Sequence, residues 1–402
     1  MSLDLNQVVI QIENMAETLK EDEQTWQGCL NRALEVFRTQ STDIDSLKRK
    51  IKNSKVTWLV AGIAEELLGN HKPDLCPHNF VVVASDGSHI DVDRHSPARC
   101  YLINVGTTIL CYGQDPDAIL CSQPTLYANQ DDMTIADPLG SGGYPVAGAL
   151  LGIKRMVAEC MALAEIGEGL SPRLPAIALL DGSLIMWGLA GDVYPEYVRT
   201  ELLKKGFLTA LGKIEEMGQN RELALASYIS HSQSSEVINA LRIAICPHDS
   251  PDCDRHCPRS SPSLERACDA VAGIRDRDLF YALLEPGERS ATFISRSSVV
   301  EKYYGEHEVR FFYLRVDDEI ARVEFPGWVE ARGQVDFVHA LLLDQCHRGQ
   351  GYPVALSESH EQAVVTSVDR ERFQHLVEHA LTEKKVSTAT SAKSRSKRTR
   401  WV

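Results

Sequence analysis

The sequence predicts an α/β fold in which a central mixed sheet is flanked by helices, with a helical extension before it. Two observations support this prediction. Apolar, β-branched runs of strand length alternate along the chain with longer segments of helical periodicity. The 402 residues are 44% apolar and 24% charged, an ordinary globular composition with enough apolar residues for a large core.

The N-terminal segment, up to about residue 56, has two apolar series at helical spacing. They are Val8, Ile12, Met15 and Leu19, and then Trp26, Leu30, Leu34 and Phe37. Residues 57–70 fit either a short helix or a strand that runs into one. We therefore predict a helical extension over residues 1–75, followed by a main domain over residues 76–384.

The main domain is expected to alternate strands and helices. The predicted strands are "FVVVASDGSHIDVDRH", which contains a turn, residues 100–113, residues 176–189, "ELALASYIS" and a strand pair within 308–328. The predicted helices are 146–166, 193–217, "SSEVINALRIAI", 334–346, 357–365 and 369–383.

Two segments differ in composition from the rest. Residues 246–263 form an insert rich in Pro, Ser, Asp and Cys. The stretch from residue 384 onward carries seven Lys or Arg and no acid, so we predict a disordered basic tail over 385–402. Such a tail either contacts phosphates or only keeps the chain soluble.

Charge and cysteine usage limit the class of protein. A net charge of −14 argues against a general nucleic-acid coat protein, but an acidic enzyme can still have a local basic channel. No apolar run approaches the ~20 residues of a membrane span, and the N-terminus has no signal-peptide core. Most of the eleven cysteines sit singly in apolar segments, which predicts reduced thiols and a cytoplasmic location without membrane contact.

The same tripeptide follows two of the apolar runs, as Asp86-Gly87-Ser88 and as Asp181-Gly182-Ser183. An aspartate at the end of a buried strand is costly without a partner, and two of them suggest a shared one. Mg²⁺ or Mn²⁺ takes oxygen ligands, and two such metals can clamp a phosphodiester. The alternative is turn chemistry alone, with each aspartate capping a backbone N–H.

A third acid is expected from the helix between these two strands. Glu159 lies among apolar neighbours and should point inward, whereas Glu165 is nearer the helix end and should be exposed. A buried glutamate also needs a partner, which favours a metal site. Arg155, one turn earlier, offers a structural ion pair instead.

Together, these segments resemble the NurA nuclease family over residues 80–380. The resemblance is carried by "VVVASDGSHI", "RMVAECMALAE", "ALLDGSLIMWG", "SYISHSQSSEVINALR", "RVEFPGW" and "GQGYPVALSESHEQAVV". It implies an RNase H-like fold and a Mn²⁺-dependent nuclease that cuts single-stranded DNA and degrades DNA from 5′ ends. It also implies a homodimer that works with a hexameric HerA translocase on DNA ends.

The resemblance implies five site residues in this chain. The metal-site acids map onto Asp86, Glu159 and Asp181, and a Tyr and His pair maps onto Tyr352 and His360. His360 would orient a water, complete the metal shell or donate a proton, and Tyr352 would bind the scissile phosphate or stack on a base. Oxygen ligands with one histidine fit Mn²⁺ somewhat better than Mg²⁺. Without the resemblance, Tyr352 is an ordinary loop-to-helix residue and His360 a structural histidine.

The insert raises the question of a second metal. Cys246, Cys253, Cys257 and Cys268 are separated by six, three and ten residues, with His248 and His256 nearby. These spacings are weak evidence for structural Zn²⁺ and still weaker evidence for an iron–sulfur cluster. A flexible loop with incidental thiols is the alternative.

Two other functions remain open from the sequence. Actin-like ATPases and sugar kinases need Gly-rich phosphate loops, for which "GSGGYPVAG" (140–148) is the candidate, although it lacks a P-loop lysine. A non-catalytic partner subunit of a DNA translocase would not need the acids at all.

Overall fold

In this computed structural model the chain divides into two compact units. The first unit comprises Met1–Pro73, Ile229–Ser297 and Arg310–Val323. The second comprises Asp74–Tyr228, Ser298–Val309 and Glu324–Val402. The structure describes residues 4–92, 98–140, 142–257 and 266–386. Nearly all of the predicted basic tail, and residues 258–263 of the insert, lie outside these ranges.

The second unit contains a mixed sheet, which confirms that part of the predicted fold class. Its strands lie in the order β8-β7-β2-β3-β4. The strands β2, β3 and β4 form an antiparallel meander, and β7 and β8 add in parallel on the other side of β2. Their bounds are β2 Phe80–Ile90, β3 Tyr101–Tyr112, β4 Asp117–Tyr127, β7 Ala176–Asp181 and β8 Leu223–Ile229.

The strand β4 is the one long strand of this sheet that the sequence did not predict. It pairs along its whole length with β3, yet most of its residues are exposed. A solvated edge strand carries no apolar period, and its Pro124 disfavours a strand except at an edge. The pattern of buried side chains that reveals β2 and β3 is therefore missing here.

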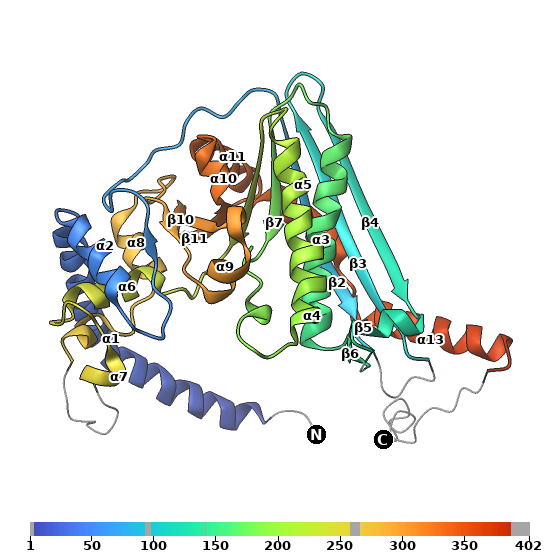
Figure 1. The fold of residues 1–402 in the computed structure, drawn as a ribbon, viewed down its shortest axis with the longest axis horizontal. Coiled ribbons are helices and arrows are strands. Elements are labelled where there is room, and N and C mark those ends of the chain that lie inside the picture. The colour runs from blue at the N-terminus through green and yellow to red at the C-terminus, as the bar shows by residue number, and fades with distance from the viewer. Residues whose placement is uncertain (1–3, 93–97, 141, 258–265, 387–402) are drawn as a thin grey trace. The chain divides into compact units, whose positions relative to one another are not determined.

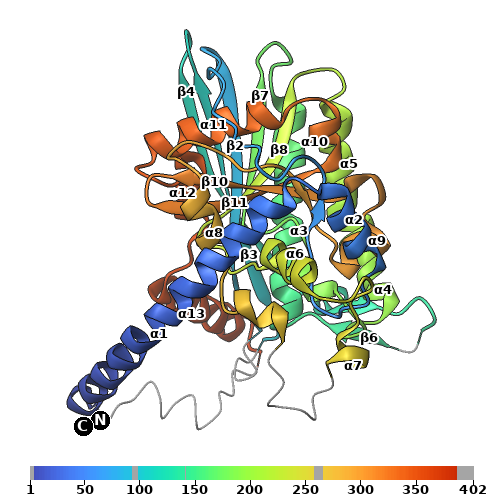
Figure 2. The same ribbon diagram turned by 90° about the vertical axis from the view of Figure 1, so that its left-hand side faces the viewer.

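Helices cover both faces of this sheet (Figures 1 and 2). The helix α3 (Ala149–Gly169) packs on β2 beside α5 (Thr209–Met217) and the π-helical segment η3 (Thr200–Leu208). The helix α12 (Val354–Ala363) packs on β2 and β3. Ser85 and Gly87 face α3 while Asp86 faces α12, and because successive strand residues point to opposite sides, the two helices lie on opposite faces.

Further elements complete the second unit. Before and between the sheet helices lie η1 Gln130–Met133, β5 Thr134–Ala136, β6 Gly143–Pro145, η2 Trp187–Leu189 and α4 Glu196–Arg199. Later in the chain come α9 Ser298–Tyr303, η5 Gly305–His307, α10 Gly327–Ala331, α11 Val335–Arg348 and α13 Ser367–Glu383. The helices predicted near 334–346, 357–365 and 369–383 are present with shifted ends.

The first unit joins the N-terminal helices to segments from the middle of the chain. Its elements are α1 Leu5–Gln40, α2 Ile44–Asn53, β1 Gly62–Ile63, α6 Glu236–Ile245, α7 Cys253–His256, η4 Ala267–Val271, α8 Asp276–Leu283, β9 Phe293–Ile294, β10 Val309–Val316 and β11 Glu319–Pro326. The strand order is β1-β9-β10-β11. Of residues 57–70, only the two of β1 are regular, so both the short helix and the strand that runs into a helix were wrong predictions.

The core of the first unit explains the two apolar series of the N-terminal segment. Leu30 and Phe37 are buried in a cluster with residues of α6 and α8, and Leu34 packs against it. The earlier residues Ile12, Met15 and Leu19 are exposed. Both series form one helix, α1, but only Leu30, Leu34 and Phe37 of the second series belong to the core, and Trp26 is exposed.

No helix in the described residues combines the length and apolar character needed to cross a membrane.

Candidate active site

Asp86 and Asp181 occupy neighbouring positions on two parallel strands. The register of β2 and β7 runs from Val81 opposite Ala176 to Ser85 opposite Leu180, and the two aspartates are the next residues of each strand. Residues at matching positions of adjacent strands point to the same face of a sheet. The two carboxylates that the sequence singled out are therefore brought together.

The two Asp-Gly-Ser tripeptides have different conformations. The strand β7 ends at Asp181, and Gly182 follows with a positive φ of +86°, as a turn requires. In contrast, β2 continues past Asp86 to Ile90, so the prediction that Asp86 ends its strand was wrong. The paired strand β3 extends β2 through the tripeptide, with Gly106 opposite Asp86.

Gly87 has a different reason to be glycine. A Cβ atom there would lie 2.5 Å from Oε1 of Glu159 and 3.0 Å from Cγ of Arg155. The absent side chain therefore leaves room for the Glu159 carboxylate beside β2. The glycine after Asp86 thus allows the third predicted acid to approach the sheet.

Glu159 is the buried acid of α3, whereas Glu165 is exposed, as the sequence predicted. Its Oε1 lies 3.4 Å from Nε of Arg155, yet both atoms are buried without a hydrogen-bond partner. Burial raises the pKa of Glu159 to about 7; Arg155 opposes this shift, and Asp86 and Asp181 add to it. The predicted ion pair with Arg155 exists, but it leaves this carboxylate incompletely compensated.

Tyr352 and His360 each bind one of the aspartates. The Tyr352 hydroxyl donates to Oδ1 of Asp181 at 3.0 Å, and Nδ1 of His360 lies 2.7 Å from Oδ2 of Asp86. Tyr352 immediately precedes Pro353, the N-cap of α12, and His360 lies in that helix. Tyr352 is thus a loop-to-helix residue, as the simpler interpretation held, and it also contacts an acid. The segment "GYPVALSESH" thereby places both side chains next to the carboxylates.

The charges of the site act on each other. The pKa of Asp181 is raised, first by burial, and the Tyr352 hydrogen bond opposes this shift while Asp86 adds to it. The pKa of Tyr352 is raised by burial and then by Asp181, so its hydroxyl stays protonated and donates. The acids therefore crowd negative charge into a partly buried space, which a cation would relieve.

The donor set fits a hard divalent cation in its chemistry. Asp86, Asp181 and His360 offer carboxylate oxygens and an imidazole on the face of the sheet that α12 covers. Glu159 offers a further carboxylate from α3 on the other face, beside Gly87, with one buried oxygen free of hydrogen bonds. Among the residues that the structure describes, no three His, Cys, Asp or Glu side chains already form a group that could hold a metal ion. Binding would therefore require side-chain rotation away from the present hydrogen bonds.

Replacing Glu159 with glutamine should change how the stability of the metal-free chain depends on pH. Because the folded pKa of about 7 exceeds the unfolded 4.5, folded Glu159 keeps its proton longer, and its contribution to wild-type stability falls as pH rises from about 4.5 to about 7. Glu159→Gln should remove roughly 3 kcal/mol of this loss. Urea unfolding in chelator at pH 5 and pH 8 measures it, with Glu165→Gln as control. Parallel pH profiles for wild type and Glu159→Gln would contradict the assignment.

The sequence did not predict the residues that hold α12 against the sheet. Nδ2 of Asn104 donates to the Gln362 and Ala363 carbonyls at 3.0 and 2.9 Å, and the Ser88 hydroxyl donates to Ala363 at 2.5 Å. At Gly106, a Cβ would lie 2.1 Å from the Ser359 carbonyl oxygen. The signal was present, because a glycine inside a β-branched run indicates a close backbone approach.

A small basic region adjoins the acids at the end of β2. Arg155 donates to the Gly87 carbonyl, and Arg370 donates to the His89 carbonyl at 3.0 Å. The pKa of His89 is lowered by burial, then by Arg155 and also by Arg370, while Asp91 opposes the shift. This acidic chain therefore does carry local positive charge next to its candidate site.

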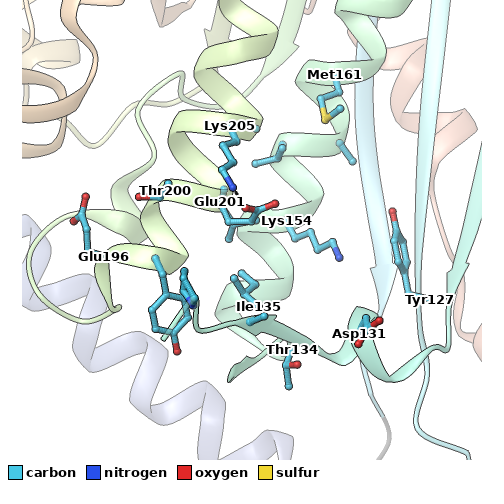
Figure 3. A pocket seen from close by; sticks show the side chains of 17 residues that line it. Tyr127, Asp131, Thr134, Ile135, Lys154, Met161, Glu196, Thr200, Glu201 and Lys205 are labelled. Carbon is cyan, nitrogen blue, oxygen red and sulfur yellow. Dashed lines mark hydrogen bonds and ion pairs between the residues drawn. The ribbon is translucent and has the colours of Figure 1, made fainter. Parts of the chain in front are cut away.

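A separate cavity of about 860 Å³ is lined by residues of α3, η3 and the end of β4. Figure 3 shows Lys154 of α3 and Glu201 and Lys205 of η3 among its lining side chains. None of the five predicted site residues lines it. It is thus distinct from the acidic site, and no sequence pattern pointed to it.

The glycine-rich stretch 140–148 does not favour a phosphate. Gly148 is the N-cap of α3, and its N–H donates to Oδ2 of Asp91 at 2.9 Å. A carboxylate therefore already lies at the helix end where a nucleotide phosphate would bind. This counts against the phosphotransfer alternative.

The fold and the site together define an α/β protein with acids gathered on the central strands of a mixed sheet. The chain belongs to the NurA domain family, whose sequence profile matches residues 80–365. This match confirms the resemblance found in the sequence. No curated protein sequence matched the chain.

The chain is also similar to solved structures, at low identity. A structure of Aquifex aeolicus Argonaute has 12% identity and a TM-score of 0.25, covering 71% of this chain and 28% of that one. A crystal structure of LC9-RNase H1, a type 1 RNase H with the type 2 active-site motif, has 10% identity and a TM-score of 0.20. That match covers 42% of this chain and 71% of the other. The chain thus spans little more than a quarter of the Argonaute.

Proposed function

We propose that the chain is a divalent-metal-dependent deoxyribonuclease that hydrolyses phosphodiester bonds. The observation that carries this proposal is the pairing of Asp86 with Asp181 on adjacent parallel strands, with the buried Glu159 close enough for both charges to raise its pKa. Tyr352 and His360 are hydrogen-bonded to these aspartates. Membership of the NurA domain family supports the same function.

Asp86, Glu159, Asp181 and His360 would hold the cation, Mn²⁺ or Mg²⁺. A bound cation of this kind activates water and neutralises charge on the phosphoryl oxygens. The chain's own residues prepare the site. Asp86 orients the His360 ring through Nδ1, so that Nε2 can hold or transfer a proton. The protonated Tyr352 hydroxyl can turn from Asp181 to a phosphate oxygen.

The local charges support a nucleic-acid substrate. Arg155 and Arg370 lie at the end of β2, beside the acids, where a DNA backbone would need positive charge. His360 is exposed, and the Asp181 carboxylate is more exposed than Asp86, so DNA could reach this face of the sheet. Phosphate contacts there would compensate for the negative charge of the whole chain.

The family resemblance supplies the finer parts of the proposal. They are an RNase H-like fold, single-strand endonuclease and 5′–3′ exonuclease activity, a homodimer, and DNA-end processing and repair with a HerA-type hexameric ATPase. The strand order β8-β7-β2-β3-β4 is compatible with this fold. Eleven cysteines without a disulfide support a cytoplasmic location.

Cleavage of end-labelled DNA by the purified full-length chain tests this function. The wild type should cut single-stranded and duplex substrates with Mn²⁺ or Mg²⁺ and should be inactive in chelator. Glu159→Gln should lower the rate by about tenfold or more, because a carboxylate close to the cation is lost. Glu165→Gln is the matched control on the same helix and should cut like the wild type. Cleavage that persists in chelator, or equal losses in both variants, would refute the proposal.

A further inference from the structure

Four cysteines from three segments of the first unit line one small cavity. Cys246 follows α6, Cys253 begins α7, Cys257 follows α7 and Cys268 lies in η4. All four are partly buried and none is in a disulfide. The cavity measures about 20 Å³, which is room for about one water-sized species. Residues far apart in the sequence thus present their thiols to one enclosed space.

The thiols are close enough to affect each other electrostatically. The pKa of the Cys253 thiol is raised, first by burial and also by Cys257, Cys268 and Cys246, while a hydrogen bond with Trp58 opposes the shift. His256 lines the same cavity, and its Nδ1 is buried without a hydrogen-bond partner. Its ring stacks on His248 with centroids 3.8 Å apart. Two buried polar atoms of cavity-lining residues, Nδ1 of His256 and Nε of Arg242, thus have no hydrogen-bond partner.

The backbone around the cavity is well anchored. Asp252 caps α7 by accepting from the Arg255 N–H at 3.1 Å. The Lys55 N–H donates to the Pro251 carbonyl at 2.8 Å, and the Ser250 hydroxyl donates to the Asn53 carbonyl at 2.8 Å. These bonds tie the segment before Cys253 to the end of α2, so α7 begins from an anchored backbone.

The apolar core does not explain this order. The helix α7 has only four residues, none of them buried. So short a helix is not stable by itself in water, because nucleation is unfavourable. Some other interaction must hold Cys253 and Cys257 beside Cys246 and Cys268, and a shared ligand of the four thiols would supply it.

We propose that Cys246, Cys253, Cys257 and Cys268 bind one structural Zn²⁺ ion. Four thiolates form a closed tetrahedral zinc site, and the three residues between Cys253 and Cys257 are a usual ligand spacing. The size of the cavity favours a single ion over an iron–sulfur cluster. The described side chains do not yet form a closed ligand set, so the thiols rotate inward as the ion binds.

The surroundings match the charge of such a site. Zinc with four thiolates carries two negative charges. Arg242 lines the cavity, and Lys50 donates to the carbonyls of Ala244, at 3.0 Å, and Cys246. Cations beside a thiolate stabilise it against protonation. The unpartnered Nδ1 of His256 is available to donate a hydrogen bond to a ligand sulfur.

Metal analysis of the full-length chain purified under reducing conditions tests the proposal. Mass spectrometry should find close to one Zn²⁺ per chain, and X-ray absorption at the zinc edge should find sulfur neighbours at about 2.3 Å. Cys253→Ser and Cys257→Ser should lower bound zinc by about tenfold or more. Cys121→Ser, a partly buried cysteine of β4, is the matched control and should keep its zinc.

A second measurement covers the case in which the ligand variants do not fold. Removing zinc from the wild type with a chelator should expose the segment around α7 to limited proteolysis, and added Zn²⁺ should restore protection. A chain that neither contains nor binds Zn²⁺, that holds iron instead, or that pairs these cysteines as disulfides would overturn the proposal. So would zinc retained in both ligand variants.

Discussion

Asp181→Asn is expected to lower the metal-dependent rate of DNA cleavage by at least about 100-fold while the chain stays folded. The amide keeps the size of the side chain and can still accept the Tyr352 hydrogen bond. It removes a negative charge from a site in which Asp86 adds to the raised pKa of Asp181, and both aspartates add to the raised pKa of Glu159. The metal-free variant should therefore be at least as stable as the wild type.

The combination of lost activity and kept stability distinguishes a catalytic role from a structural one. Initial rates on end-labelled DNA at saturating Mn²⁺ measure the first, and urea unfolding in chelator measures the second. Asp115→Asn, in the exposed turn before β4, is the matched control and should cut normally. An Asp181→Asn chain that cuts at the wild-type rate, or one that loses activity only because it unfolds, would contradict the assigned role.

Much of the fold could be predicted because most strands and helices carry a clear apolar period. The buried run of β2 and the long apolar helix α3 are examples. The strand β4 could not be predicted, because an exposed strand lacks the alternation of apolar and polar residues. The prediction that β2 ends at Asp86 was also wrong. The Asp-Gly-Ser of β2 continues as a strand because it pairs with β3, and local residue preferences do not specify that pairing.

The candidate site, too, could be predicted only as far as local sequence patterns specify it. The types of the acids and their place after apolar runs predicted Asp86 and Asp181, and apolar neighbours separated the buried Glu159 from the exposed Glu165. The hydrogen bonds of Tyr352 and His360 could not be read from spacing, because they depend on how α12 packs against β2 and β3. The shared cavity of the four cysteines likewise arises only when α6, α7 and η4 come together.

Gly106→Ala is expected to destabilise the chain by about 3 kcal/mol, because it forces the helix that carries His360 away from the sheet. The added Cβ would lie 2.1 Å from the Ser359 carbonyl oxygen and 2.4 Å from the Ala363 nitrogen, both backbone atoms of α12. A backbone cannot yield as the end of a side chain can, and Asn104 holds the same helix end in place. The helix must shift as a whole.

That shift should also lower activity, since Gly106 lies opposite Asp86 in the β2–β3 register and the helix carries His360 to the 2.7 Å contact with Asp86. Thermal unfolding and cleavage assays at a temperature where the variant is folded separate the two effects. The matched control is Gly152→Ala in α3, where a Cβ meets no atom within 4 Å. This control should gain up to about 1 kcal/mol from helix propensity. Equal stability of the two variants would show that the close approach of α12 to β3 does not hold in solution. The contact between His360 and Asp86, which depends on that approach, would then be wrong as well.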